Sequence, residues 1–352
     1  MKNSWFGIFT FTSIASLFTL FSCVSTENIE PEMPIEKSDE LVLNLSAPEA
    51  LKTRAEEGYR LRYIAKLFPP KNSSGIDKEK MQRAEILEDS DPSKNQIRFT
   101  VDPDQTYQIL VFADYIPDIN IKEDGTITDC YYDTSSKDEF INMYLTPNIN
   151  AKGDLNMVAD EFFNNDYYDC FYANLKLYKT AEKESRKVEL SRAIAKVQFK
   201  DKSENPGTLT NITFSYLKFY NQFNLLANSK GLSYQYPTTV TNNLDATNLS
   251  KDKDGDDLFL FFYSFANEKN ENLSADNFEV KMTTHISENV NVVSVNSKFP
   301  IYKNYKTRIN GLLIPQDIKS AQPGDSPSTQ EGDIILNVTT NSNWNGSEIK
   351  EF

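Results

Sequence analysis

The sequence has little histidine and little positive charge, and each shortage excludes a class of function. It contains one histidine in 352 residues. A zinc site built from several histidines is therefore excluded, and any Ser-His-Asp triad would have to use His285. The 37 basic residues are outnumbered by 51 acidic residues, for a formal net charge of −14. Phosphate backbones repel such a chain, so nucleic acid is not an expected partner.

Motifs of common enzymes and cofactor sites are also absent. The chain has no CxxC pair, no glycine-rich phosphate loop, and no HExxH or GxSxG sequence. The run Asp252–Asp257 resembles a calcium loop, but its glycine is at the fourth rather than the sixth position, so a hairpin turn is favoured. We therefore expect no enzymatic activity, no cofactor and no metal.

Aromatic residues are plentiful instead. The chain contains 23 Phe, 18 Tyr and 2 Trp, enough to build a hydrophobic core despite an overall hydrophobic fraction of 39%. The length of 352 residues suits about two domains.

The N-terminus is typical of an export signal. Lys2 is followed by an uncharged, mostly apolar stretch at residues 5–21. The stretch ends in Leu20-Phe21-Ser22-Cys23, which resembles the lipobox of bacterial lipoproteins, in which the signal is removed and the cysteine is acylated. We interpret residues 1–22 as a lipoprotein signal peptide and Cys23 as the lipidated residue. The alternative is an ordinary signal peptide or N-terminal anchor with a chance cysteine.

An acidic, proline-bearing segment at residues 23–40 then predicts a flexible tether between the lipid and the fold. The remaining cysteines, Cys130 and Cys170, belong to an exported chain, where disulfides persist. A disulfide between them and two buried thiols are equally compatible with the sequence.

Alternating apolar residues predict strands through most of the chain. At residues 41–47, Leu41, Leu43 and Leu45 share one face. The same alternation at residues 60–68 predicts a second half-buried strand, and the nearly continuous apolar run at 107–116 predicts a strand buried on both faces. Further strands are expected at residues 212–219, 258–265, 278–286, 307–314 and 333–340. Residues 77–88 and 154–163 lack alternation and are expected to form short helices or loops with helical turns.

A charged run at residues 182–187 separates two apolar regions, and we place a domain boundary there. In the segment 188–199 that follows, the apolar residues change from even to odd positions. Val188 and Leu190 are at even positions, whereas the apolar residues from Ala193 to Phe199 alternate at odd positions. Such a change predicts a bulge or a strand that passes between two sheets. Many short strands joined by polar turns indicate β-sandwich domains, here at residues 41–186 and 187–352.

One loop is a candidate processing site. Lys52–Gly58 follows the first predicted strand, is polar and contains Arg54 before the small residue Ala55. A trypsin-like protease could cut an exposed loop of this kind. On composition alone, an ordinary loop remains the simpler interpretation.

Several of these features together resemble the fimbrillin family, the pilins and accessory subunits of Bacteroidales type V pili. The similar positions are the lipobox at Cys23, the segment Thr53-Arg54-Ala55 after the first strand, and the segments Tyr107–Tyr115, Tyr168–Ala173, Leu190–Phe199 and Tyr302–Ile314. The resemblance spans most of the chain, although each motif is short. It implies an all-β fold of two transthyretin-like Greek-key β-sandwich domains in tandem.

The resemblance also implies an assembly pathway and a location. An Arg-specific protease would cut between Arg54 and Ala55 and release the lipidated piece with the first strand, including Leu41, Leu43 and Leu45. A strand from another subunit would then fill the groove, and we hypothesise that it comes from residues 333–352, in which Ile334, Leu336 and Val338 alternate.

The implied partners are other pilus subunits, the protease and, through the lipid, the outer membrane. The implied location is the fimbrium on the outer cell surface. Shaft, anchor and tip roles stay open. The alternative is a monomeric surface lipoprotein that binds glycan or a host protein, which would not require cleavage at Arg54.

Overall fold

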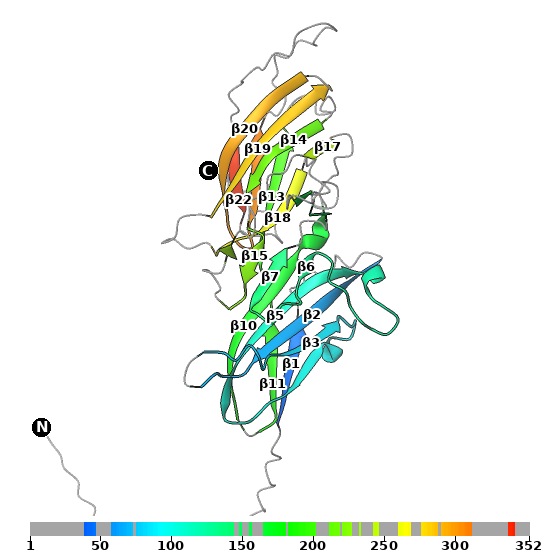
Figure 1. Ribbon diagram of the computed structural model, residues 1–352, viewed down its shortest axis with the longest axis vertical. Coiled ribbons are helices and arrows are strands. Elements are labelled where there is room, and N and C mark those ends of the chain that lie inside the picture. The colour runs from blue at the N-terminus through cyan, green and yellow to red at the C-terminus, as the bar shows by residue number, and fades with distance from the viewer. Residues whose placement is uncertain are drawn as a thin grey trace, which may run out of the picture. The chain divides into compact units, whose positions relative to one another are not determined.

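The computed structural model describes the chain from residue 39, with gaps. The described residues are 39–46, 58–72, 75–143, 148–149, 155–156, 165–180, 182–201, 211–218, 220–226, 232–233, 242–245, 260–268, 276–287, 290–311 and 337–341. Almost all of their regular structure is strand, as the sequence predicts (Figure 1). The described helices are single 3-10 turns: η2 (Pro92–Lys94), η3 (Asp118–Asn120) and η4 (Asp166–Tyr168).

The N-terminal half of the described chain, from β1 to β12, forms a β-sandwich. Its three-stranded sheet has the order β11 (Glu184–Glu189), β1 (Glu40–Ser46) and β4 (Gln96–Thr100). Its five-stranded sheet has the order β12 (Ser191–Arg192), β10 (Cys170–Lys179), β5 (Gln105–Pro117), β2 (Tyr59–Phe68) and β3 (Gln82–Leu87). One cluster of buried residues includes the leucines of β1 and apolar residues of β2, β5 and β10, so the two sheets pack face to face.

The C-terminal half, from β13 onward, contains two four-stranded sheets. One has the order β18 (Leu260–Phe265), β13 (Ile194–Asp201), β21 (Lys306–Gly311) and β22 (Asn337–Asn341). The other has the order β17 (Asn242–Asp245), β14 (Asn211–Lys218), β19 (Asp276–Ser287) and β20 (Val290–Ile301).

Short strands complete the described structure. A small sheet has the order β16 (Leu232–Ser233), β15 (Gln222–Asn224), β7 (Phe140–Met143) and β6 (Tyr132–Asp133). Its β7–β15 pairing links the two halves of the chain. The remaining pair is β8 (Asn148–Ile149) with β9 (Leu155–Asn156).

The same strand order occurs in both halves. The orders β11-β1-β4 and β10-β5-β2-β3 in the first correspond to β21-β13-β18 and β20-β19-β14-β17 in the second. The relative directions agree as well, because β1 is parallel to β11 and β13 is parallel to β21, while every other matched pair is antiparallel. Residues from Lys37 onward form one compact unit. The repeat fits the expected tandem of domains, whose boundary near residue 186 stays a prediction.

Two expectations from the sequence are confirmed in detail. Strand β5 is buried on both faces, as its apolar run predicts. The parity change in residues 188–199 marks a passage between sheets, because β11, β12 and β13 belong to three different sheets. The charged run before this passage lies largely in β11, which pairs with β1 rather than acting as a linker.

Two other expectations are wrong. Residues 82–87, expected to be helical or looped, form β3, because β2 offers them an antiparallel partner along most of its length. The sequence predicts that β2 exposes one face to solvent. Arg62 and Lys66 lie on that face, yet their side chains are as buried as Tyr63 on the inner face. The reason is that residues 129–138 cover the outer face of the five-stranded sheet. Arg62 and Lys66 donate hydrogen bonds to this covering segment.

The packing of β1 yields a stability prediction. Replacing Leu43 by Ala should lower the free energy of unfolding by about 2–5 kcal/mol, because the surrounding core cannot fully collapse around the lost volume. Replacing the neighbouring Asn44 by Ala removes only partly exposed hydrogen bonds and should cost about 1 kcal/mol. Urea unfolding followed by circular dichroism measures both. Equal effects would contradict the assignment of Leu43 to the core.

Candidate strand-release site

Strand β1 buries its apolar face in the core of the N-terminal sandwich. Leu41, Leu43 and Leu45 are 0%, 0% and 3% exposed. They lie on one side of the strand because successive residues alternate between the faces of a sheet. Burial of a leucine contributes about 1.5–3 kcal/mol, so the three together contribute roughly 5–9 kcal/mol to any strand held here.

The main chain of β1 is paired on both sides. It runs parallel to β11, from Leu41 opposite Glu184 to Ser46 opposite Glu189. It also runs antiparallel to β4, from Glu40 opposite Thr100 to Asn44 opposite Gln96. No direct β4–β11 pairing is present in the described part of the chain. Removing β1 would therefore leave two rows of main-chain donors and acceptors facing an apolar groove.

Polar side chains form a ladder on the outer face of this sheet. The Asn44 amide donates to Ser185 Oγ at 2.7 Å and accepts from the Gln96 amide at 2.9 Å. Arg98 donates to Glu40 Oε1 at 2.7 Å, and this hydrogen bond lowers the pKa of Glu40. These exposed contacts add little stability. The leucines and the main-chain pairing therefore hold β1 in place.

The segment that contains Arg54 lies in the sequence between strands of different sheets. Strand β1 ends at Ser46, and the described chain resumes at Gly58, whose φ of +93° suits glycine. Strand β2 follows directly in the five-stranded sheet. Arg54 and Ala55 themselves lie outside the described residues.

The other predicted site residues are placed only in part. Cys23, Ile334 and Leu336 lie outside the described residues. Val338 lies in β22, which pairs with β21 of its own chain and places Val338 opposite Ile309. Cys130 and Cys170 are present as thiols, not as a disulfide.

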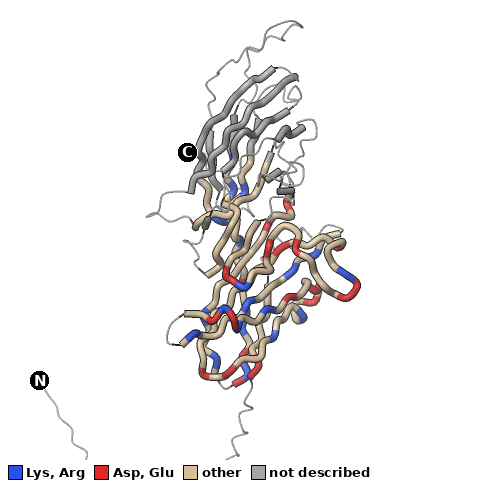
Figure 2. Tube along the Cα trace, in the orientation of Figure 1, with Lys and Arg blue, Asp and Glu red and all other residues tan. Residues whose placement is uncertain are grey.

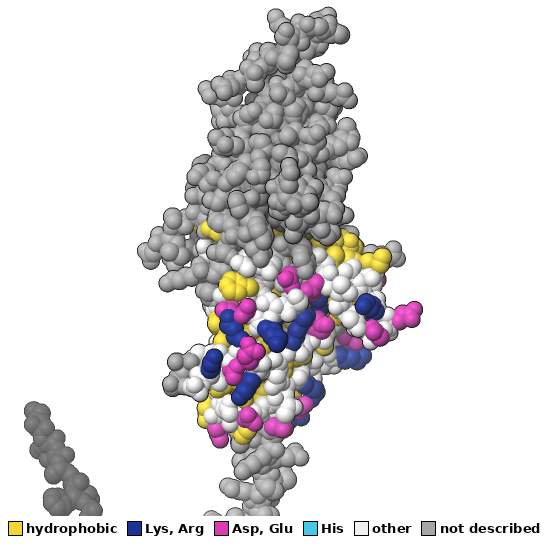
Figure 3. Space-filling model, viewed as in Figure 1, with side chains coloured by type: hydrophobic (Ala, Val, Ile, Leu, Met, Phe, Trp, Pro, Cys, Tyr) yellow, Lys and Arg dark blue, Asp and Glu magenta, His cyan; other side chains and the backbone are white. Residues whose placement is uncertain are grey.

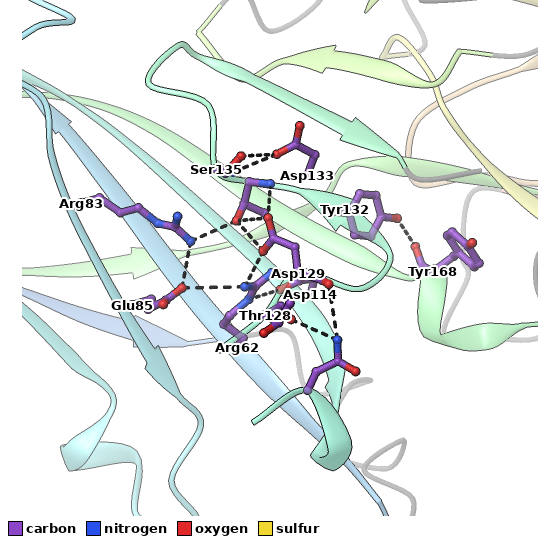
Figure 4. A network of polar contacts seen from close by, with 12 residues as sticks. Arg62, Arg83, Glu85, Asp114, Thr128, Asp129, Tyr132, Asp133, Ser135 and Tyr168 are labelled. Carbon is purple, nitrogen blue, oxygen red and sulfur yellow. Dashed lines mark hydrogen bonds and ion pairs between the residues drawn. The ribbon is translucent and has the colours of Figure 1, made fainter. Parts of the chain in front are cut away.

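The outer face of the five-stranded sheet carries a buried ionic network that the sequence analysis missed (Figure 4). Arg62 of β2 donates to both carboxylate oxygens of Asp114 on β5, at 2.9 and 2.7 Å, and to Asp129 at 2.7 Å. Asp129 in turn accepts the main-chain N–H of Thr134 at 2.7 Å. The network therefore ties the segment 129–134 to two central strands. No linear signal reveals it, because its residues come from separate parts of the sequence.

The charge of Arg62 is stabilised despite its burial. Burial opposes the charge, but the attraction of Asp114 and Asp129 outweighs it and raises the pKa of Arg62. Both side chains of the Arg62–Asp114 pair are 0% exposed. Such a pair constrains geometry more than it adds stability, because desolvation offsets much of the attraction.

Lys66 fastens the same covering segment at a second point. Its Nζ donates to the carbonyl oxygens of Ser136 at 2.7 Å and Asp138 at 3.2 Å. Burial lowers the pKa of Lys66 to about 8. Because Lys66 and Arg62 share one phase of β2, the same strand anchors both ends of the segment.

Further ion pairs lie around η4, one with β12 and one with β13 of the C-terminal half. Arg192 binds both carboxylate oxygens of Asp169, at 2.7 and 2.8 Å. Lys196 of β13 contacts Asp166 Oδ1 at 2.9 Å, and the Tyr263 hydroxyl donates to the same oxygen at 2.5 Å. The contacts of Asp166 with Lys196 and Tyr263 join the two halves, as the β7–β15 pairing also does.

The described residues contain neither a metal-binding cluster nor a membrane-spanning helix. Among them, no group of three or more His, Cys, Asp or Glu residues could hold a metal ion. None of their helices is sufficiently long or apolar to cross a membrane. Acidic and basic residues are interspersed along the trace of the N-terminal half and on the face drawn in Figure 3, without a large patch of one sign (Figures 2 and 3).

The buried network predicts a specific pattern of stability. Arg62→Met should lower the free energy of unfolding by about 3–5 kcal/mol, because it leaves the buried Asp114 carboxylate without its positively charged partner. Adding Asp114→Leu should recover most of that loss. Lys187→Met breaks an exposed pair with Glu189 and should leave stability nearly unchanged. Urea unfolding of the four proteins tests this, and a double variant no better than Arg62→Met would contradict it.

Comparison with solved structures finds proteins of related size but low similarity. Two are putative cell adhesion proteins. The one from Parabacteroides distasonis ATCC 8503 has 10% identity and a TM-score of 0.40 and covers 86% of this chain and 95% of its own. The one from Bacteroides eggerthii DSM 20697 has 13% identity and a TM-score of 0.39 and covers 87% and 96%. A fimbrial assembly protein from Parabacteroides distasonis ATCC 8503 has 12% identity and a TM-score of 0.31 and covers 89% and 97%.

Comparison with curated proteins finds no match. A family model does match, over residues 34–346, which includes both halves of the described fold. The match spans most of the chain, so the protein belongs to the family described as "Family of unknown function (DUF6562)".

Proposed function

We propose that this protein is a structural, adhesive subunit of a cell-surface pilus. In this proposal the chain is exported as a lipoprotein through Cys23 and carried to the outer cell surface. An Arg-specific protease cuts after Arg54, strand β1 leaves, and a strand from another subunit takes its place. The chain then acts through its surfaces and its polymer, without catalysis.

The placement of β1 is the observation that supports this proposal. It is the first described strand of the chain, and it is central in its sheet, between β11 and β4. A cut in the loop after it would separate β1 covalently from every other strand. The separated strand would then be held only by non-covalent contacts, and another strand with the same alternation of apolar residues could compete with it for the groove.

The vacated groove has what an incoming strand needs. Ile97 and Phe99 of β4 and Val188 of β11 are at most 4% exposed and border the leucines of β1. An added strand would pair with β4 and β11 through its main chain and fill the leucine positions with its own apolar side chains. Ile334, Leu336 and Val338 of the C-terminal segment have the required alternation.

A C-terminal donor would have to exchange one set of pairings for another. Strand β22 already pairs with β21, from Lys306 opposite Asn341 to Asn310 opposite Asn337. It lies at an edge of its sheet, so leaving breaks hydrogen bonds on one side only. Pairing between β4 and β11 would supply bonds on both sides, which favours the exchange once β1 is gone.

Limited digestion with an Arg-specific protease tests the release step. We expect selective cutting at Arg54, followed by a ladder of oligomers on a native gel and a mass that shows loss of the N-terminal piece. Arg54→Ala should abolish both the cut and the ladder.

Digestion of Arg98→Lys provides the matched control, since Arg98 lies within β4 and is protected by its pairing. Its cutting and its ladder should equal those of the unsubstituted chain. Resistance at Arg54, or cutting without a change of oligomeric state, would contradict the proposal. That result would favour an anchor subunit or a monomeric lipoprotein that binds glycan or protein.

Truncation tests the donor. Deleting residues 333–352 should abolish the ladder after cleavage at Arg54, because the alternating segment is lost. Deleting only residues 342–352 keeps β22 and should preserve polymerisation.

Both truncated chains are first checked for cooperative unfolding, so that a misfolded C-terminal half is recognised. If it is found, Val338→Asp in the full chain replaces the longer deletion, with the same expected loss. Polymerisation that persists without residues 333–352 would contradict the assignment of the C-terminal donor strand. It would not contradict the release of β1 by cleavage at Arg54.

A further inference from the structure

The repeated topology identifies an edge that carries a further strand in one half and, among the described residues, none in the other. In the C-terminal half, β21 pairs with the central strand β13 on one side and with β22 on the other. In the N-terminal half, β11 pairs with the central strand β1 on one side. Within the residues described, β11 has no strand on its other side.

We align the two central strands by setting Leu45 of β1 against Phe199 of β13, and their registers then align β11 with β21. In the first half, Leu45 of β1 lies opposite Val188, and in the second half Phe199 of β13 lies opposite Ile309. Matching these pairs aligns Val188 with Ile309. The preceding residues, Lys187 and Arg308, are then both cationic. Strands β11 and β21 therefore both carry a basic residue followed by a β-branched residue at the aligned positions.

Charge on β11 does not prevent an added strand from pairing there. Lysine on an exposed edge commonly discourages pairing. Yet β21, with Lys306 and Arg308, accepts β22 in full register. The short sequence of β22, Asn-Val-Thr-Thr-Asn, is uncharged and rich in β-branched residues, which suits pairing beside a basic edge.

We propose that β22 of a second copy of this chain docks antiparallel on the outer edge of β11 while β1 is still in place. The register follows from β21 and β22, and it sets Val338 of the second copy opposite Val188 and Thr339 opposite Lys187. The inference rests on the proposed assembly through the C-terminal segment and specifies its first contact. Docking at this edge requires no cut at Arg54.

The length of chain before β22 permits such an exchange between copies. Residues 312–336 separate β21 from β22, a connection of 25 residues. At about 3.3 Å per residue, it could span up to roughly 80 Å when extended. The connection is therefore long enough for β22 to reach a neighbouring copy while β21 stays paired with β13.

Cysteine cross-linking between two full-length chains tests the register. One chain carries Val188→Cys and the other Val338→Cys with a different affinity tag, and both carry Arg54→Ala. Opposed residues in an antiparallel pair have Cα atoms about 4.5–5.5 Å apart, within the range that a disulfide bridges. Mild oxidation should give a mixed dimer on a non-reducing gel, absent when either substitution is omitted.

Two matched controls fix the geometry. Lys187→Cys moves the thiol one residue along the same strand and onto the opposite face, so its yield with Val338→Cys should fall several-fold. Ile309→Cys with Val338→Cys in one chain should form an intramolecular disulfide, which verifies that position 338 is reactive in its own sheet. Unsubstituted chain, with its native cysteines, measures the background.

A third position separates this inference from the proposed function. Ile97 of β4 lies opposite Leu43 of β1, so a donor strand that takes the place of β1 would bring its residue at the Leu43 position next to Ile97→Cys. A mixed dimer through position 188 in uncleaved chain supports edge docking. Coupling at 97 that appears only after cleavage in chains with native Arg54, with none at 188 before cleavage, overturns edge docking and supports strand exchange. Coupling at neither position before or after cleavage overturns both.

Discussion

The N-terminal sandwich depends on one short strand that two distant strands share. Strand β1 supplies the only sheet neighbour of β11, and the pairing partner of β4, within the described residues. It also places three leucines between the two sheets. Main-chain pairing and side-chain burial therefore act at the same site, and neither is replaced if the strand leaves. This concentration makes β1 a main stabilising element of the sandwich, and the proposed function uses the same strand as its point of exchange.

The five-stranded sheet is built on a different principle. Its inner face is apolar, but its outer face holds charged residues beneath the segment 129–138. Arg62 and Lys66 bind that segment through Asp129 and through main-chain carbonyls. Ionic contacts in a dry environment are directional, so they fix where the segment lies more than they stabilise it.

The recurrence of one strand order in both halves shows how little sequence identity a sandwich requires. Leu41 and Leu43 in β1 correspond to Ala195 and Val197 in β13, and all four are buried. What is shared is the alternation and the direction of the neighbouring strands, not the residues. The halves differ at their margins, where β12 extends one sheet and β22 another. The edge strands are therefore the part of the repeated fold in which the two halves differ.

The sequence by itself determined the all-β class, the inward phase of β1, the two-sided burial of β5 and the parity change after Val188. These follow from local alternation, which is readable wherever a strand has a consistent inside and outside. Only the tertiary structure decided that residues 82–87 are a strand, that Arg62 and Lys66 are buried, and that β1 pairs with β11. Each of these depends on a partner that lies far away in the chain. Alternation specifies a face to be covered, but it does not specify which segment covers it.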